Sequence, residues 1–329
     1  MRGEGVPQDY EQAVYWFRKA AEAGHVYAQN NLGWQYMLGE GVPQDYEQAA
    51  YWFRQAAEGG YFRAQNNLAW RYMNGEGVPQ DYEQAVYWFR QAAEGGNVYA
   101  QNNLGWQYVL GEGVPQDYEQ AVYWFRQAAE GGNLTAQNNL AWRYRNGEGV
   151  PQDYEQAVYW FRQAAEGGDT AAQNSLAWSY LYGEGVSQDY VQATRWFRIA
   201  AEGGDLVAMN NLAVSYRLGE GVPQDYVQAV YWFRQAAEGG NLTAQNNLAW
   251  RYMNGEGVPQ DYVQAVYWFR LAAEGGNLAA QRSLGLRYMH GEGVPQDYEQ
   301  AAYWFALAAA QGDSWAQELL DEVTKILTV

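Results

Sequence analysis

Cysteine is absent from this chain of 329 residues, and histidine occurs only at His25 and His290. Without cysteine the chain has no disulfide bonds and no thiolate ligands for a metal ion. The two histidines are too far apart in sequence to indicate a ligand cluster, so we expect no metal site and no cofactor. Walker-type loops, His-Glu-x-x-His motifs and nucleophile elbows are also missing from the sequence. We therefore predict that the chain is not an enzyme.

Positive charge is scarce as well, because 20 Lys and Arg residues stand against 38 Asp and Glu residues. The formal net charge of −18 argues against nucleic acid as a partner, since phosphates require a basic surface. It also argues against binding to anionic membrane surfaces. The apolar runs are too short to span a bilayer, which excludes membrane insertion. No signal peptide follows Met1, so we expect a cytoplasmic protein by default, and a periplasmic or secreted one if the sequence is a fragment.

A repeated block dominates what the chain does contain. The block Gly-Glu-Gly-Val-Pro-Gln-Asp-Tyr returns with small variations every 36 residues, and no insertion interrupts it. A fixed period of this length indicates small stacked units rather than one compact core. The period is marked by tryptophan at 16, 52, 88, 124, 160, 196, 232, 268 and 304.

Each repeat contains two predicted helices, which the copy at 75–110 illustrates. Asp81 and Gln84 form a capping-box arrangement at the start of a helix over 81–94, and the glycine pair at 95–96 ends it. This helix, which we call the B helix, carries apolar residues at the 3.6-residue period of a core-facing helix. The residues predicted to face the core are Tyr82, Ala85, Trp88, Phe89, Ala92 and Ala93.

The second helix of the copy, over 98–109, we call the A helix. Asn97 is placed to cap its first turn, and most other copies hold Asn or Asp there. His25 and Tyr61 are the exceptions, and we expect looser helix starts after them. Gly105 lies beside the core face, and its small size predicts a close approach of two helices. The residues predicted to form that face are Ala100, Leu104 and Tyr108.

One copy shows the repeat pattern complete, in Ala28, Leu32, Gly33, Tyr36, Gly39, Gly41, Val42, Asp45, Ala49, Trp52, Ala56, Ala57 and Gly60. This pattern resembles the Sel1-like repeat family, a relative of the tetratricopeptide repeat, over essentially the whole chain. The resemblance implies an all-α fold, a right-handed α-solenoid of tandem 36-residue helix-turn-helix repeats whose A helices line a concave groove. It also implies an adaptor role in assembling protein complexes, often in bacterial signalling, envelope and host-interaction systems.

The repeat boundaries predict the domain organisation. We expect residues 1–329 to form a single solenoid, with a partial and uncapped first repeat at 1–24, eight full repeats at 25–312 and a C-terminal capping helix at 313–329. The last helix is more polar than the others, as a terminal cap should be. The first helix bears the same apolar face as interior copies, so we expect that end to fray or to support self-association.

The candidate binding surface is the A-helix face directed away from the core, where tryptophan and asparagine recur. Flat apolar area combined with amide donors and acceptors is good binding material, and these amides resemble those with which other helical repeats grip an extended peptide. Acidic residues lie almost wholly in the loops and on the B helices, so we expect a neutral or acidic protein segment as partner. The predicted groove residues are Asn30, Trp34, Asn66, Trp70, Asn102, Trp106, Asn138, Trp142, Asn174, Trp178, Asn246 and Trp250, with Arg71, Arg143 and Arg251.

Other interpretations of the same residues stay open. Aromatic stripes are usually core, so the A-helix tryptophans would then only close the inner wall between neighbouring helices. The Trp and Asn ladder would also suit a small molecule or a glycan. A β-lactam-type hydrolase is a weaker alternative, because the paired cysteines of the relatives linked to β-lactam binding are absent here.

Overall fold

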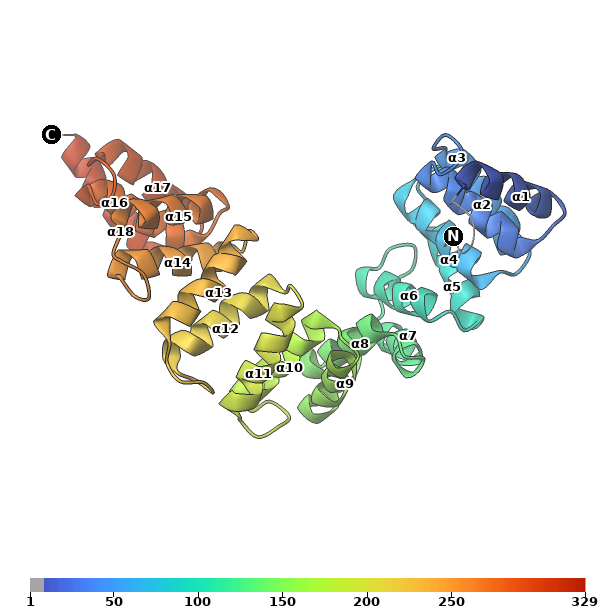
Figure 1. The fold of residues 1–329 in the computed structure, drawn as a ribbon, viewed down its shortest axis with the longest axis horizontal. Coiled ribbons are helices and arrows are strands. Elements are labelled where there is room, and N and C mark those ends of the chain that lie inside the picture. Colours follow the sequence, from blue (N-terminus) through green and yellow to red (C-terminus); the bar gives the residue numbers. More distant parts are fainter. Residues whose placement is uncertain (1–8, 329) are drawn as a thin grey trace. The chain divides into compact units, whose positions relative to one another are not determined.

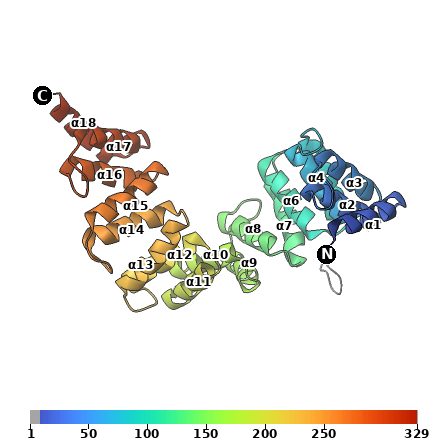
Figure 2. The same cartoon turned by 45° about the horizontal axis from the view of Figure 1, so that its top comes forward.

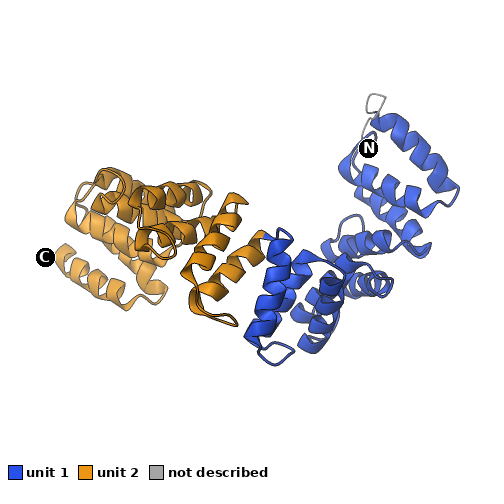
Figure 3. Cartoon of the chain, turned by 60° about the horizontal axis from the view of Figure 1, so that its bottom comes forward, with its two compact units in different colours: residues 1–169 blue, residues 170–329 orange. Residues whose placement is uncertain are grey.

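The computed structural model describes residues 9–328, and every regular element within that range is an α-helix. The B helices have odd numbers and the A helices have even numbers. The chain divides into two compact units, residues 1–169 and residues 170–329, which Figure 3 shows in different colours. Within each unit, consecutive helices lie side by side (Figure 1 and Figure 2). The predicted all-α architecture of tandem helix pairs is confirmed.

The helix bounds follow the 36-residue period throughout the described residues. The first unit contains α1 (Tyr10–Glu22), α2 (Val26–Leu38), α3 (Tyr46–Glu58), α4 (Phe62–Asn74), α5 (Tyr82–Glu94), α6 (Val98–Leu110), α7 (Tyr118–Glu130), α8 (Leu134–Asn146) and α9 (Tyr154–Glu166). The second contains α10 (Thr170–Tyr182), α11 (Tyr190–Glu202), α12 (Leu206–Leu218), α13 (Tyr226–Glu238), α14 (Leu242–Asn254), α15 (Tyr262–Glu274), α16 (Leu278–His290), α17 (Tyr298–Ala310) and α18 (Ser314–Leu327).

The helix starts are fixed by the capping residues that the sequence predicts. The Asp81 carboxylate accepts a hydrogen bond from the Gln84 backbone N–H at 3.0 Å, at the start of α5. Asn97 Oδ1 accepts from the Ala100 N–H at 2.9 Å, at the start of α6. Each such bond satisfies a backbone donor that has no partner inside its helix. His25 and Tyr61 make no side-chain cap hydrogen bond, which agrees with the looser starts expected there.

The core of each repeat is centred on phenylalanine rather than tryptophan. Phe89 and its equivalents on the B helices are fully buried. Gly105 lies close to the ring of the next B helix, because a Cβ added there would stand 2.7 Å from Phe125 Cε1. The predicted close helix approach is therefore confirmed. The fully buried phenylalanines are Phe53, Phe89, Phe125, Phe161, Phe197, Phe233, Phe269 and Phe305.

The prediction that every B-helix tryptophan belongs to the core was wrong. Trp268 and Trp304 are buried, but Trp88 and most of its equivalents are only partly buried, and Trp16 is 61% exposed. A buried tryptophan needs room for a large ring and a partner for its N–H. The phenylalanine one position later fills the space between helices, and the tryptophan covers the edge of that space.

Two contacts outside the apolar core hold neighbouring helices together. Gly77 has a φ of 72°, and it lies against the start of α3, where an added Cβ would stand only 1.9 Å from the Tyr46 carbonyl oxygen. Within one copy, Arg90 Nη2 on α5 donates to the Tyr108 hydroxyl on α6 at 2.9 Å. Equivalents of both contacts occur in other repeats, so the loop contact sets the spacing between copies and the Arg–Tyr bond sets the two helices within each copy.

The predicted subdivision of the chain stays a prediction. Of the predicted partial repeat at 1–24, residues 1–8 lie outside the described residues. The remaining helix, α1, packs against α2 through buried Val14 and Ala21.

Candidate functional site

The A-helix tryptophans lie partly inside and partly outside the core. Each of the six predicted groove tryptophans contacts the phenylalanine of the following B helix edge-on. The ring centroids of Trp70 and Phe89 are 5.9 Å apart, and those of Trp106 and Phe125 are 5.8 Å apart. The tryptophans are nevertheless only half-buried. One edge of each indole ring therefore packs against the core, as the inner-wall interpretation expects, and the other edge lies on the A-helix face.

The asparagines form a ladder that links consecutive A helices. Asn67 Nδ2 donates to Asn30 Oδ1 at 2.9 Å, and Asn103 Nδ2 donates to Asn66 Oδ1 at 3.1 Å. The same bond joins Asn139 to Asn102 in the first unit, and it recurs in the second unit. The donor is always the second residue of an Asn-Asn doublet, and it lies 37 residues after its acceptor. We predicted only the first asparagine, although the doublet was visible in the sequence.

The ladder is interrupted within the second unit at α16. Serine stands where a donating asparagine is needed, and the Ser283 hydroxyl instead donates to the Ala279 carbonyl at 2.8 Å. Asn246 Oδ1 is consequently buried without a hydrogen-bond partner. The unpaired carbonyl is a direct result of one substitution in the repeat pattern.

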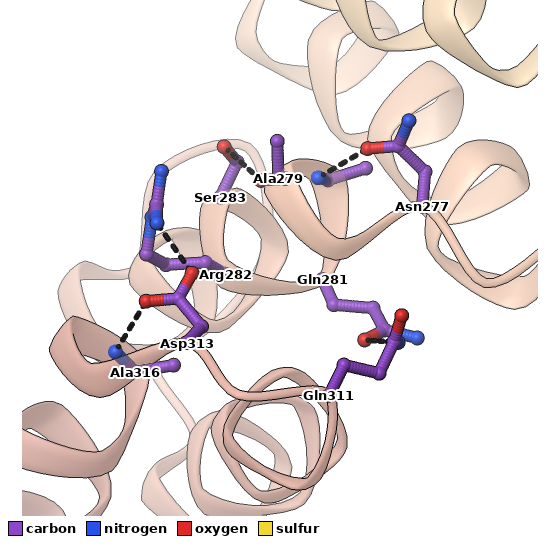
Figure 4. A network of polar contacts seen from close by, with 9 residues as sticks. Asn277, Ala279, Gln281, Arg282, Ser283, Gln311, Asp313 and Ala316 are labelled. Atoms are coloured by element: carbon purple, nitrogen blue, oxygen red, sulfur yellow. Dashed lines mark hydrogen bonds and ion pairs between the residues drawn. The ribbon is translucent and has the colours of Figure 1, made fainter.

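A different polar cluster takes over next to this interruption (Figure 4). Arg282 occupies the place of the first asparagine and forms an ion pair with Asp313, whose other carboxylate oxygen accepts from the Ala316 N–H at 3.0 Å. The guanidinium also lies 4.7 Å from the centroid of the Trp315 ring. Asp313 therefore caps α18 and neutralises Arg282 at once.

The three predicted groove arginines are tied to loop glutamates. Arg71 Nη1 lies 2.6 Å from Glu76 Oε2 and is largely buried, and Arg143 and Arg251 form the equivalent ion pairs with the glutamates five residues later. Burial lowers the pKa of Arg71 and of Arg251, and the neighbouring glutamate opposes part of that shift. Their positive charge is compensated locally, so these side chains add little field to the A-helix face.

Two adjoining hollows lie on the A-helix face of the first unit. The larger has a volume of about 730 Å³ and the smaller about 330 Å³, and both are lined by Asn66 and Tyr99. The larger is further lined by Trp70, Val98, Asn102, Asn103, Leu134, Thr135 and the residues 131–133. The smaller is further lined by Tyr27, Asn30, Asn31, Trp34, Tyr61, Arg63, Asn67 and Asn97.

These hollows collect five of the predicted groove residues, namely Asn30, Trp34, Asn66, Trp70 and Asn102. Trp106, Asn138 and Trp142 are not among the residues that line them, and Asn174, Trp178, Asn246 and Trp250 lie in the second unit. The most exposed aromatic lining residues, Tyr27 at 62% and Tyr99 at 68%, were not predicted as site residues. Their signal was the variability of that position from copy to copy.

Within residues 9–328, no group of three or more His, Cys, Asp or Glu side chains is placed to hold a metal ion. In the same part of the chain, none of the helices combines the length and apolar character needed to cross a bilayer.

Comparisons with known proteins agree on the repeat. A family model described as the Sel1 repeat matches residues 1–25, 26–61, 62–97, 98–133, 134–169, 170–205, 206–241, 242–277 and 278–313. A protective antigen of uropathogenic Escherichia coli strains, displaying an SLR fold, is 41% identical with a TM-score of 0.83, over 95% of this chain and 68% of that chain. A Sel1 repeat protein from Oxalobacter formigenes is 32% identical with a TM-score of 0.77, over 97% and 95% of the two chains. The search of curated proteins found no match.

Proposed function

The chain belongs to the Sel1 repeat family, and we propose that it is a scaffold that binds a protein or peptide segment on the A-helix face of its first unit. Sel1 repeat folds are commonly protein-interaction scaffolds, and the family is generally non-enzymatic. The observation that carries the proposal is the pair of adjoining hollows, which share Asn66 and Tyr99 and combine half-buried indole rings with a fixed row of carboxamides.

The hollows suit an extended segment for two physical reasons. Exposed tyrosine rings and half-buried tryptophans offer large rigid apolar area, which is typical of the residues that dominate binding energy. The Asn ladder adds amides whose orientation is set in advance, because one oxygen of each doublet pair already accepts from the neighbouring repeat. Prior ordering of these groups reduces the entropy lost on binding.

The test is a selection of random heptapeptides displayed on phage against the immobilised full chain. We expect peptides to be enriched by the wild-type chain and to be lost, by about ten-fold or more, with the double variant Tyr27→Ala and Tyr99→Ala. The matched control is Tyr123→Ala, which removes an equally large and half-exposed ring from the B helix α7. Equal recovery of peptides by both variants would show that the hollows are not the binding site.

A glycan is the second candidate ligand, and one observation favours it. The rings of Tyr27 and Tyr99 are exposed beside the carboxamides of Asn30 and Asn66, an arrangement in which a sugar ring could stack and hydrogen-bond. A glycan array probed with the same variants separates the two ligand classes. Glycan binding that depends on Tyr99, without any peptide enrichment, would replace the peptide proposal.

A further inference from the structure

Arg63 lines the smaller hollow and forms no ion pair with any of the residues that the structure describes. The second residue of the A helix varies from copy to copy. It is Tyr27 in α2, Arg63 in α4 and Tyr99 in α6. In the later A helices it is Thr135, Ala171, Val207, Thr243, Ala279 and Trp315. Arg63 is therefore the single charged residue at this position. It is exposed and lines the smaller hollow.

Five other A-helix arginines form ion pairs, unlike Arg63. Arg71, Arg143, Arg251 and Arg287 are bound to loop glutamates, and Arg282 is bound to Asp313. Arg63 forms no ion pair within residues 9–328. In a chain whose net charge is −18, an uncompensated guanidinium that lines a hollow is a specific attraction for an anion.

The amides around Arg63 are held in fixed orientations and offer both donors and acceptors. Asn66 Oδ1 accepts from Asn103 Nδ2 at 3.1 Å, and Asn30 Oδ1 accepts from Asn67 Nδ2 at 2.9 Å. The NH₂ groups of Asn66 and Asn30 are thereby left as donors for a ligand, whereas Asn67 presents its oxygen. The guanidinium of Arg63 has donors only, so it decides the preference of the hollow for a carboxylate, which only accepts hydrogen bonds.

We propose that the smaller hollow receives a carboxylate of the bound segment on Arg63, while an apolar side chain of that segment enters the larger hollow. This inference rests on the proposed function, because both hollows belong to the same surface. The larger hollow is suited to the apolar part by Trp70, Val98 and Leu134. We assign the carboxylate to an Asp or Glu side chain of a segment that runs across both hollows, since they adjoin at Asn66 and Tyr99; a C-terminal carboxylate is the outcome against which the test is set.

The experiment repeats the heptapeptide selection with two libraries, one with a free C-terminus and one displayed through its C-terminus. The variants are Arg63→Gln, Arg63→Lys and the control Arg195→Gln, which removes the same charge from the exposed side of the B helix α11. Circular dichroism checks that the helices persist, which we expect because Arg63 is exposed. Synthetic versions of the selected peptides are then titrated by fluorescence anisotropy at low and high salt.

We expect the wild-type chain and Arg195→Gln to enrich acidic residues at one position in both libraries. Arg63→Gln should weaken the selected peptides by about ten-fold, a typical value for one charge-assisted contact. Arg63→Lys should recover part of that affinity, and added salt should weaken the wild-type chain more than Arg63→Gln.

Two outcomes overturn the inference in different ways. Peptides that the wild-type chain enriches without a preference for an acidic side chain, or only from the library with a free C-terminus, reject the side-chain carboxylate. An acidic preference that survives in Arg63→Gln rejects Arg63 as its site. Both results leave the proposed function standing. Failure of the wild-type chain to enrich any peptide over the Tyr27→Ala and Tyr99→Ala variant rejects the proposed function, and the inference falls with it.

Discussion

Replacing Gly77 by alanine, and Gly96 by alanine for comparison, should separate the cost of a left-handed backbone conformation from the cost of a steric clash with a neighbouring helix. Gly77 and Gly96 both have positive φ, at 72° and 86°, so an alanine at either position adopts a left-handed conformation at a cost of about 1–2 kcal/mol. At Gly96 nothing lies within 4 Å of the added Cβ, whereas at Gly77 that atom would stand 1.9 Å from the Tyr46 carbonyl oxygen. The start of α3 must then move away, which adds about 1–3 kcal/mol by analogy with overpacked cores.

We therefore expect Gly96→Ala to lower the free energy of unfolding by about 1–2 kcal/mol and Gly77→Ala by about 2–5 kcal/mol. Urea titrations followed by circular dichroism measure both. Because a repeat array couples mainly to nearest neighbours, hydrogen exchange should also show the Gly77→Ala effect concentrated in α3 to α5. Equal losses in the two variants would refute the argument that the backbone contact between the Gly77 loop and α3 sets the repeat spacing.

Three further predictions follow from the packing. Phe125→Ala should lower the free energy of unfolding by about 3–5 kcal/mol, more than Trp124→Ala does, because only the phenylalanine is fully buried. Urea titrations measure both losses, and a larger loss for Trp124→Ala would show that the tryptophan is the core residue. Ser283→Asn should raise stability by about 0.5–1.5 kcal/mol by supplying the donor that Asn246 lacks, and an unchanged melting temperature would show that the amide cannot complete the ladder. The exposed ring of Trp16 should support self-association that Trp16→Glu weakens in sedimentation velocity, and a monomeric wild-type chain or association unaffected by the change would refute this contact.

The helices were predictable from sequence because each is specified locally. An Asp or Asn cap, a 3.6-residue apolar period and glycines at the helix ends leave little choice of bounds, and the structure places α5 and α6 within a residue of the expected positions. The choice between Trp88 and Phe89 as the core residue was not predictable in this way. Both lie on the apolar face, and only the spacing of neighbouring helices decides which ring fills the gap.

The candidate site was less predictable, for a related reason. The sequence shows that Asn66 and Trp70 share a face with Arg71, but it does not show that Glu76 in the following loop neutralises the arginine. It likewise does not show that Tyr99 and Arg63 line the same hollow. The charge pair depends on how the loop after α4 turns back toward Arg71, and the hollow depends on residues of consecutive A helices, whereas helical periodicity is carried by adjacent turns of one helix.

The Asn ladder has a consequence for how such a chain is able to change length. Each doublet supplies a hydrogen-bond donor to the repeat before it and an acceptor to the repeat after it. Asn67 donates to Asn30, and Asn66 accepts from Asn103. Any module that keeps both asparagines is therefore compatible with any other at this seam, so modules can be gained, lost or exchanged without a new interface. The helix α16, which has Arg282 and Ser283 instead, breaks this seam on both sides, because Ser283 gives Asn246 no donor and Arg282 pairs with Asp313.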